Sequence, residues 1–277
     1  MSTAQNISRR PWLVALAIAL MAAGIPLTML SLAAEPAAEG LPTAKLQQLF
    51  LEASQAYNAG RPLDAAALYK QLMDQGYAPR ELLYNMGNAF FKAGKLGEAS
   101  LYYRRAWYLS PRDPDIRANL SFALQNAGAS APDYLMPVKI LHKLSLSEWS
   151  MLGMLSYWLA CGFLAAFILR PFNRQLLQKG IVLFAGLTVL SLAGIGSWLQ
   201  LYAHPEVVVI ATGQKALSGP VNDSVALFTV APGSLVLEKN EREAWTEILL
   251  DKQTGWIPSA SCKKVVDWNT LKSSAYP

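Results

Sequence analysis

The sequence is poor in the residues from which catalytic and metal sites are usually built. Its 277 residues include two cysteines and two histidines, and charged residues make up 16% of the chain. Neither histidine, His142 or His204, has a cysteine, a carboxylate or the other histidine at metal-ligand spacing. No phosphate-binding glycine loop, nucleophile elbow or zinc-binding helix motif is present. We therefore expect no catalytic residue, no metal and no cofactor, and we expect that the protein is not an enzyme.

The charge pattern also gives no indication of nucleic-acid binding. The net charge is +5, but the basic residues are spread over loops and termini rather than gathered in one run with interleaved aromatic residues. The two cysteines, Cys161 and Cys262, lie in segments that we expect in different environments, one in a membrane and one outside it. They are therefore not expected to form a disulfide within one chain.

Long uncharged runs account for a hydrophobic content of 53%. The first run, Pro11–Ala34, follows Arg9 and Arg10 and ends in the small-x-small pattern Ser31-Leu32-Ala33. Residues 1–33 are therefore predicted to be a secretory signal peptide. An uncleaved N-terminal anchor is the alternative.

Two later runs are each long enough to span a bilayer, and they predict transmembrane helices over residues 148–169 and 180–203. The loop between them, 170–179, contains Arg170, Arg174 and Lys179 and no acidic residue, so the positive-inside rule places it in the cytoplasm. Both flanking domains are then expected on the opposite, periplasmic side. Candidates for the interfacial aromatic belts are Trp149, Trp158, Trp198 and Tyr202.

Three glycines, Gly60, Gly94 and Gly128, are spaced 34 residues apart and are each expected to close a short helix. A 34-residue period with two helices per unit is typical of tetratricopeptide (TPR) repeats. We predict an all-α TPR solenoid over residues 46–127, with two repeats and a closing helix, followed by a linker over 128–147. The alternative is an unrelated helical bundle.

The middle repeat has the clearest pattern. Gly87 and Ala99 are expected where its two helices cross, because a larger side chain would separate the backbones. Asp113 is expected to cap the next helix, with Pro114 in the first turn.

The inner, concave face of such a solenoid is the expected partner-binding surface. It should present aromatic and amide side chains, with Asn88 as the one residue that matches a carboxylate clamp, so a clamp of this kind is not expected. The alternative is that some of these aromatic residues pack on a neighbouring domain. The predicted partner-binding residues are Phe50, Tyr57, Tyr84, Asn88, Phe91 and Phe122, with Ser54 and Gln125 on the same face.

After residue 205 the sequence changes to short β-branched runs separated by turns. Five strands are predicted, at Val207–Ala211, Ser224–Phe228, Leu235–Leu237, Trp245–Leu250 and Gly255–Ile257. Five strands in about sixty residues suit a small barrel that closes its own edges. Residues 206–268 resemble a bacterial SH3-like domain because of Gly219-Pro220, Trp245 and the ending Gly255-Trp256-Ile257-Pro258, with a short helical turn after it. Trp245 and Trp256 are expected to be packing residues or, alternatively, to face a ligand.

The whole chain is therefore predicted to be multidomain, with a TPR solenoid, a two-helix transmembrane hairpin and an all-β SH3-like barrel. This domain order resembles the BatE-type proteins of Bat (aerotolerance) operons. Three short sequence segments agree with this resemblance: LYNMGNA at 83–89, DPDIRANL at 113–120 and LSEW at 146–149. The resemblance implies protein partners: membrane-anchored von Willebrand factor A proteins, a BatD-type protein and a MoxR-type ATPase.

Two functions follow from these patterns. The first is an inner-membrane scaffold or adaptor that binds envelope proteins through a periplasmic TPR face, and the resemblance links it to oxidative stress or aerotolerance. The alternative is a cell-wall module that binds peptidoglycan through the SH3-like domain, with Trp245 or Trp256 facing the ligand.

Overall fold

The computed structural model describes residues 43–134, 136–169, 173–203 and 205–266. The chain divides into two compact units, one containing Leu144–Trp198 and the other containing the described parts of Ala38–Lys143 and Leu199–Pro277. The second unit therefore combines residues from before and after the predicted membrane hairpin. The predicted signal peptide lies outside the described residues.

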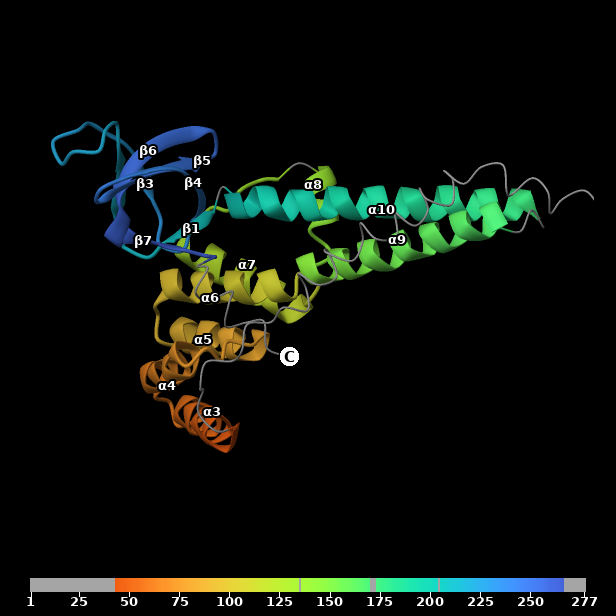
Figure 1. Ribbon diagram of the computed structural model, residues 1–277. Helices are drawn as coiled ribbons and strands as arrows, with labels where there is room; N and C mark the ends of the chain where they lie inside the picture. The colour runs from red at the N-terminus through yellow and green to blue at the C-terminus, as the bar shows by residue number, and fades with distance from the viewer. Residues whose placement is uncertain (1–42, 135, 170–172, 204, 267–277) are drawn as a thin grey trace, which may run out of the picture. The chain divides into compact units, whose positions relative to one another are not determined.

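The first part of the second unit is a series of antiparallel helix pairs (Figure 1), in which each helix contacts the next along the chain. Two of these helices, α4 and α7, begin with a proline, which suits a first helical turn because its nitrogen needs no partner there. The five helices are α3 (Thr43–Asn58), α4 (Pro62–Asp74), α5 (Arg80–Lys92), α6 (Leu96–Leu109) and α7 (Pro114–Ala127).

The three glycines with 34-residue spacing end α3, α5 and α7 with the same geometry. Their φ angles are +76°, +74° and +59°, a left-handed conformation that favours glycine. In each case the N–H of the residue after the glycine donates to a carbonyl five residues earlier, at 2.9 Å. This bond is typical of the Schellman helix ending. The prediction that each glycine closes a helix is confirmed.

Steric contact explains the glycine inside α5. A Cβ atom on Gly87 would lie 2.5 Å from the Tyr103 ring on α6, closer than real carbon contacts. Ala99 beside this crossing is fully buried. The carboxylate of Asp113 accepts hydrogen bonds from the N–H groups of Asp115 and Ile116, at 3.0 and 3.3 Å. Both the helix crossing and the helix cap are therefore confirmed.

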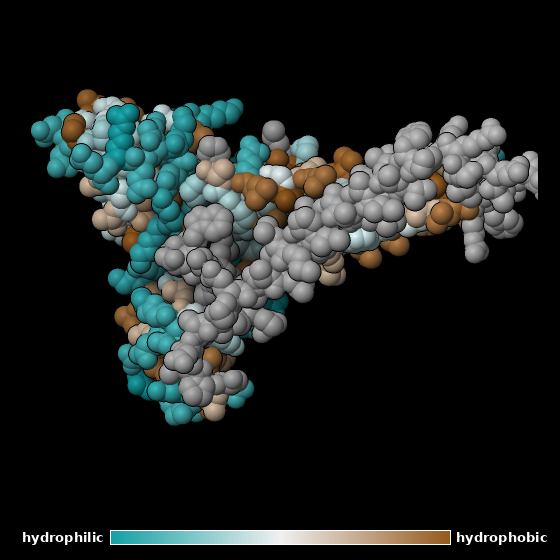
Figure 2. Space-filling model, viewed as in Figure 1, coloured by the Kyte–Doolittle hydropathy of each residue, from teal (hydrophilic) through white to brown (hydrophobic). Residues whose placement is uncertain are grey.

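Two helices, α9 (Leu146–Leu169) and α10 (Arg174–Ala203), form the apolar hairpin, and both are long and apolar enough to cross a membrane. Apolar side chains are visible along their described parts in Figure 2. They pack through small residues, with the hydroxyl groups of Ser156 and Thr188 3.0 Å apart. Because α10 begins at Arg174, the segment 174–179 is helical rather than part of the predicted loop.

Two of the tryptophans predicted for the aromatic belts instead pack inside this hairpin. Trp149 is 5% exposed and lies against Gly194, while Trp198 is completely buried. The Trp198 indole N–H donates to the carbonyl of Leu144 at 2.9 Å. The end of α10 is therefore tied to the chain just before α9.

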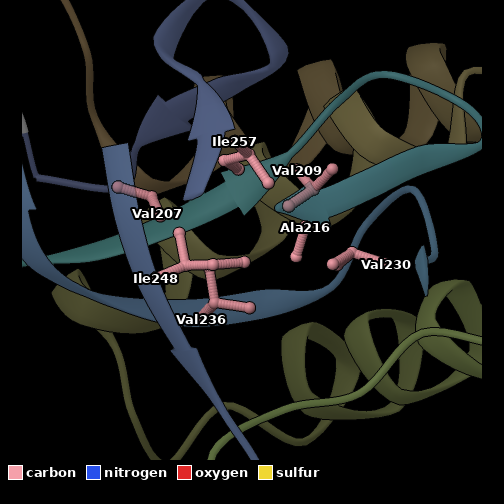
Figure 3. Close-up of a cluster of buried hydrophobic side chains, with 7 residues drawn as sticks. All are labelled: Val207, Val209, Ala216, Val230, Val236, Ile248 and Ile257. Carbon is pink, nitrogen blue, oxygen red and sulfur yellow. The ribbon is translucent and has the colours of Figure 1, made fainter. Parts of the chain in front are cut away.

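The β domain consists of one antiparallel sheet with the strand order β3-β2-β6-β5-β4-β1-β7. Its seven strands enclose an aliphatic core, shown in Figure 3, that contains Val207, Val209, Ala216, Val230, Val236, Ile248 and Ile257. The strands are β1 (Glu206–Val209), β2 (Gln214–Leu217), β3 (Ala226–Val230), β4 (Leu235–Arg242), β5 (Trp245–Leu250), β6 (Gln253–Pro258) and β7 (Cys262–Lys264).

The five-strand prediction was incomplete, because it missed β2 and β7. The β2 segment, QKAL, has no β-branched residue, and β7 has only three residues, so neither gives a strand pattern. The predicted closure was also wrong for the described strands, because β3 and β7 are unpaired edges of the sheet. The predicted short helical turn is present, as a 3₁₀ helix over Ser259–Ser261 directly after β6.

The segment predicted as a linker, 128–147, is more ordered than its composition indicated. It contains a short helix, α8 (Met136–Leu141). The carbonyl of Ser130 accepts a hydrogen bond from the N–H of Leu235 in β4, at 2.9 Å. This segment therefore helps to connect the helical repeats to the β domain.

Candidate functional site

The best-connected of the predicted partner-binding residues lie on α5 and α7. Asn88 accepts hydrogen bonds from the Tyr103 hydroxyl at 2.7 Å and from the Asn119 amide at 3.3 Å. The same Asn119 amide donates to the Tyr84 hydroxyl at 2.8 Å. These bonds fix the orientation of the amide and aromatic side chains before any partner is present.

An aromatic pair extends this surface. The rings of Phe91 on α5 and Phe122 on α7 lie 5.4 Å apart, and Phe122 is 54% exposed although it is large and apolar. Tyr84, Asn88 and Phe91 are each partly exposed. We call these four residues, Tyr84, Asn88, Phe91 and Phe122, the aromatic–amide surface.

The first repeat contains a smaller version of the same arrangement. Phe50 packs edge-on against Tyr69 with ring centres 5.5 Å apart, and Ser54 lies 3.1 Å from the Tyr69 hydroxyl. These residues precede Tyr84, Tyr103 and Asn88 by 34 positions. The side-chain contacts therefore repeat with the same period as the helix ends.

Tyr57 has a different environment from the other predicted residues. The Lys92 ammonium lies 4.5 Å from the centre of the Tyr57 ring and donates to the Tyr57 carbonyl at 3.2 Å. One face of the ring is therefore covered by a cation. Among the contacts that the structure describes, no side-chain hydrogen bond joins Phe50 or Tyr57 to the aromatic–amide surface.

The two tryptophans of the β domain lie outside its aliphatic core. In β5 the buried positions are Thr246 and Ile248, so Trp245 is on the opposite face of the strand, and Trp256 alternates in the same way with buried Ile257 in β6. Both tryptophans are partly exposed. The Arg242 guanidinium lies 5.7 Å from the Trp256 ring centre. This position favours the ligand-facing interpretation over core packing.

An ion pair that the sequence did not predict lies between α6 and β1. The Arg104 guanidinium donates two hydrogen bonds to the Glu206 carboxylate, at 2.6 and 2.7 Å. The hydroxyl groups of Tyr108 and Tyr134 donate to the same carboxylate, the first at 3.1 Å. Side-chain exposure is 9% for Arg104 and zero for Glu206. We call these four residues the buried junction.

The ionisation of the buried junction follows from its geometry. Burial alone would raise the pKa of Glu206, but the Arg104 charge and the hydrogen bonds from Arg104, Tyr134 and Tyr108 hold its pKa below the ordinary value. Burial and the Glu206 charge raise the pKa of both tyrosine hydroxyls. The pair is therefore ionised at neutral pH, with both tyrosines protonated as donors.

Backbone contacts extend the buried junction into a continuous interface. Arg105 donates to the carbonyls of Val265 and Lys264, at 3.0 and 2.9 Å. A Cβ atom on Gly97 of α6 would lie 2.8 Å from the Cα of Ile210, so the helix and the chain after β1 approach as closely as a glycine permits. The helical repeats and the β domain thus pack as one body through α6.

Only weak local signals in the amino-acid sequence point to this interface. Glu206 is the one charged residue beside the run Val207-Val208-Val209, and Arg104 lies among aromatic residues of α6. Arg104 and Glu206 are 102 positions apart, so only the fold brings them together. The contacts that the structure describes between the two domains include several from α6.

No group of three or more His, Cys, Asp or Glu side chains within the described ranges could hold a metal ion. The described cysteines are both free, with Cys161 buried and Cys262 partly buried.

Comparison with known proteins identifies no relative: no protein-family model, curated protein or solved structure matches the chain.

Proposed function

We propose that the protein is a membrane-anchored scaffold that binds partner proteins through the aromatic–amide surface. The observation that carries this proposal is the large exposed ring of Phe122 beside Phe91, next to amides held by hydrogen bonds. Rigid aromatic anchors in a prearranged polar setting are typical of the few residues that dominate binding energy. The fixed orientation of Asn88 and Tyr84 lowers the entropy lost on binding.

We assign the helical pairs to the TPR class and the β domain to the SH3-like class. The repeated glycine helix ends and the repeated Tyr69 and Tyr103 contacts, all at a 34-residue period, support the first assignment. The small antiparallel sheet with a 3₁₀ turn after β6 supports the second. Under this proposal the buried junction holds the SH3-like domain at a fixed position relative to the TPR surface.

The proposed location is a bacterial inner membrane, with both domains in the periplasm. The apolar hairpin and the basic residues Arg170, Arg174 and Lys179 between or near its helices support this location. The partners we propose are those of Bat-type complexes: von Willebrand factor A proteins anchored in the same membrane, a BatD-type protein and a MoxR-type ATPase.

Labelling of introduced cysteines by a membrane-impermeant reagent tests this topology. Asn173 and Asp223 are exposed sites on the two expected sides, whereas Cys262 is a poor reporter because it is partly buried. With the outer membrane made permeable, Asp223→Cys should react in whole cells and Asn173→Cys only after lysis. The reverse pattern would place both domains in the cytoplasm.

Co-purification after mild detergent extraction tests the binding proposal. Phe122→Ala and the pair Tyr84→Ala/Phe91→Ala should each reduce recovery of envelope proteins that the unaltered protein retains. Leu63→Ala is the matched control, because Leu63 is an apolar side chain of similar exposure, 52%, on α4. Equal recovery with all three variants would contradict binding through the aromatic–amide surface.

Peptidoglycan binding by the β domain is the second candidate function. The position of Trp245 and Trp256 outside the aliphatic core favours it, since partly exposed aromatic rings suit sugar and peptide ligands. Sedimentation of the detergent-solubilised full chain with purified peptidoglycan tests it. Co-sedimentation that Trp256→Ala abolishes would support this function, and an unbound chain would exclude it.

A further inference from the structure

The outward face of α8 has an amphipathic surface that neither proposed function uses. Met136 and Ile140 are 67% and 57% exposed, and they lie on one side of the helix because they are four positions apart. Lys139 and Lys143 are exposed beside them. At 100° per residue, these four side chains occupy one continuous arc of the helix surface.

The opposite side of α8 is held by the helical repeats. His142, in the turn that continues α8, is 4% exposed, and its ring lies 6.3 Å from Trp107 and 5.8 Å from Tyr134. The His142 N–H also donates to the Val138 carbonyl at 2.9 Å, which continues the helical turn. The outward direction of Met136 and Ile140 is therefore fixed by packing on the inner side.

Chain connectivity limits how far α8 can be from the membrane. The Leu144 carbonyl accepts the Trp198 indole N–H, so Leu144, two positions before α9 begins, lies beside the last third of α10. Leu144 comes three positions after Leu141, the last residue of α8. These three backbone steps can span about 11 Å at most. The polar headgroup layer on each side of a bilayer is about 5–8 Å thick.

We propose that α8 lies on the membrane surface, with Met136 and Ile140 in the headgroup region and Lys139 and Lys143 against anionic lipid phosphates. The proposal rests on the membrane-spanning part of the proposed function, but not on any partner. Interfacial helices combine apolar side chains with flanking lysines in this way. One lysine also bonds a protein carboxylate, since Lys139 lies 2.6 Å from Asp133, which is 88% exposed and can release it.

Depth measurement by spin labelling tests the proposal on the full chain. A nitroxide on Ile140→Cys is studied in nanodiscs of zwitterionic and anionic phospholipids, with Cys161→Ala and Cys262→Ser removing the native thiols. Leu51→Cys is the matched control, because Leu51 is equally exposed, at 57%, but lies on α3. The ratio of accessibility to oxygen over accessibility to a water-soluble nickel chelate should be severalfold higher for the label at residue 140 than for the control label at residue 51.

The lysines are tested in the same system. Lys139→Gln/Lys143→Gln should lower the oxygen preference at residue 140 in anionic discs and leave it unchanged in purely zwitterionic discs. Each lysine near an anionic surface is expected to contribute about a fivefold preference. An oxygen preference in anionic discs that the lysine variant leaves unchanged would overturn the lipid-phosphate contact.

A label at Val189, 66% exposed on α10, separates this proposal from the membrane assignment on which it rests. If the label at residue 189 is exposed to lipid but the label at residue 140 is as exposed to water as the control label at residue 51, the α8 proposal alone is overturned. Water exposure at both 189 and 140 would overturn the membrane hairpin and the α8 proposal together.

Discussion

The aromatic–amide surface and the buried junction use similar side chains in opposite ways. Both combine aromatic rings with strongly hydrogen-bonding groups, and both involve α6, through Tyr103 and through Arg104. At the junction, four side chains satisfy one another inside the protein. At the aromatic–amide surface, the hydrogen bonds are internal but Phe122 remains 54% exposed. The adjacent residues Tyr103 and Arg104 of one helix therefore contribute to two different surfaces, one proposed for recognition and one that holds the β domain.

The buried junction and the aromatic–amide surface differ because the β domain covers the first and leaves Phe122 of the second exposed. A charge is tolerated in the interior only when it is paired and fully hydrogen-bonded, and the β domain supplies Glu206 as the partner of Arg104. Neutral amides and aromatic rings need no such cover and remain stable at a surface. We therefore expect substitutions at the junction to reduce folding stability, and substitutions at the aromatic–amide surface to reduce binding.

The largest effect is expected from removing one member of the ion pair. Glu206→Leu leaves Arg104 buried without its counter-charge, which should lower the free energy of unfolding by about 3–5 kcal/mol. Denaturant unfolding of the full chain in detergent, followed by tryptophan fluorescence, measures this loss. The double variant Arg104→Met/Glu206→Leu should recover much of it. A double variant as unstable as Glu206→Leu would mean that the pairing itself is not what matters.

The pH dependence sharpens the same point. The folded pKa of Glu206 lies below its ordinary value of 4.5, so its stabilisation is complete above that pH and is lost as the pH falls through the folded pKa. The stability difference between the unaltered protein and Glu206→Gln should therefore shrink below pH 4.5. Other carboxylates titrate in both proteins and cancel. A difference that stays constant down to acid unfolding would contradict the ionised pair.

The helix crossing in the second repeat gives an intermediate effect. Gly87→Val should reduce the free energy of unfolding by about 1–3 kcal/mol, because the added atoms overlap the Tyr103 ring. The equivalent position in the first repeat is Ala53, which is fully buried. Ala53→Gly is the matched comparison and should cost about 1 kcal/mol, mainly from helix propensity. Equal losses would show that the crossing at Gly87 is not sterically limited.

The smallest of these losses is expected at a helix cap. Asp113 accepts from two backbone N–H groups at the start of α7, so Asp113→Ala should cost about 1 kcal/mol. Asp113→Asn keeps the capping acceptor but loses the ion pair with Arg80. It should therefore retain most of the stability in the same unfolding measurement, and a loss equal to that of the alanine variant would assign the effect to the ion pair.

Local features of this fold could be predicted from the sequence, whereas its long-range interface could not. Glycine spacing predicted three helix ends because a left-handed residue is required at each. Uninterrupted apolar runs predicted the two long helices. The buried junction depends on Arg104 and Glu206, which no local pattern connects, and strand β2 lacks any β-branched residue. The aromatic–amide surface lies between these cases, because its residues were predicted but their hydrogen bonds were not.

Site-specific photo-crosslinking shows whether Phe122 contacts a partner in the cell. A photoreactive phenylalanine analogue at position 122 replaces one aromatic ring by another, so the fold should be retained; the same analogue at position 63 on α4 is the control. We expect adducts with an envelope protein from position 122 that are absent from position 63 and weakened by Tyr84→Ala. Identical adducts from both positions, or none from 122 in cells that contain the co-purified partners, would contradict recognition through the aromatic–amide surface.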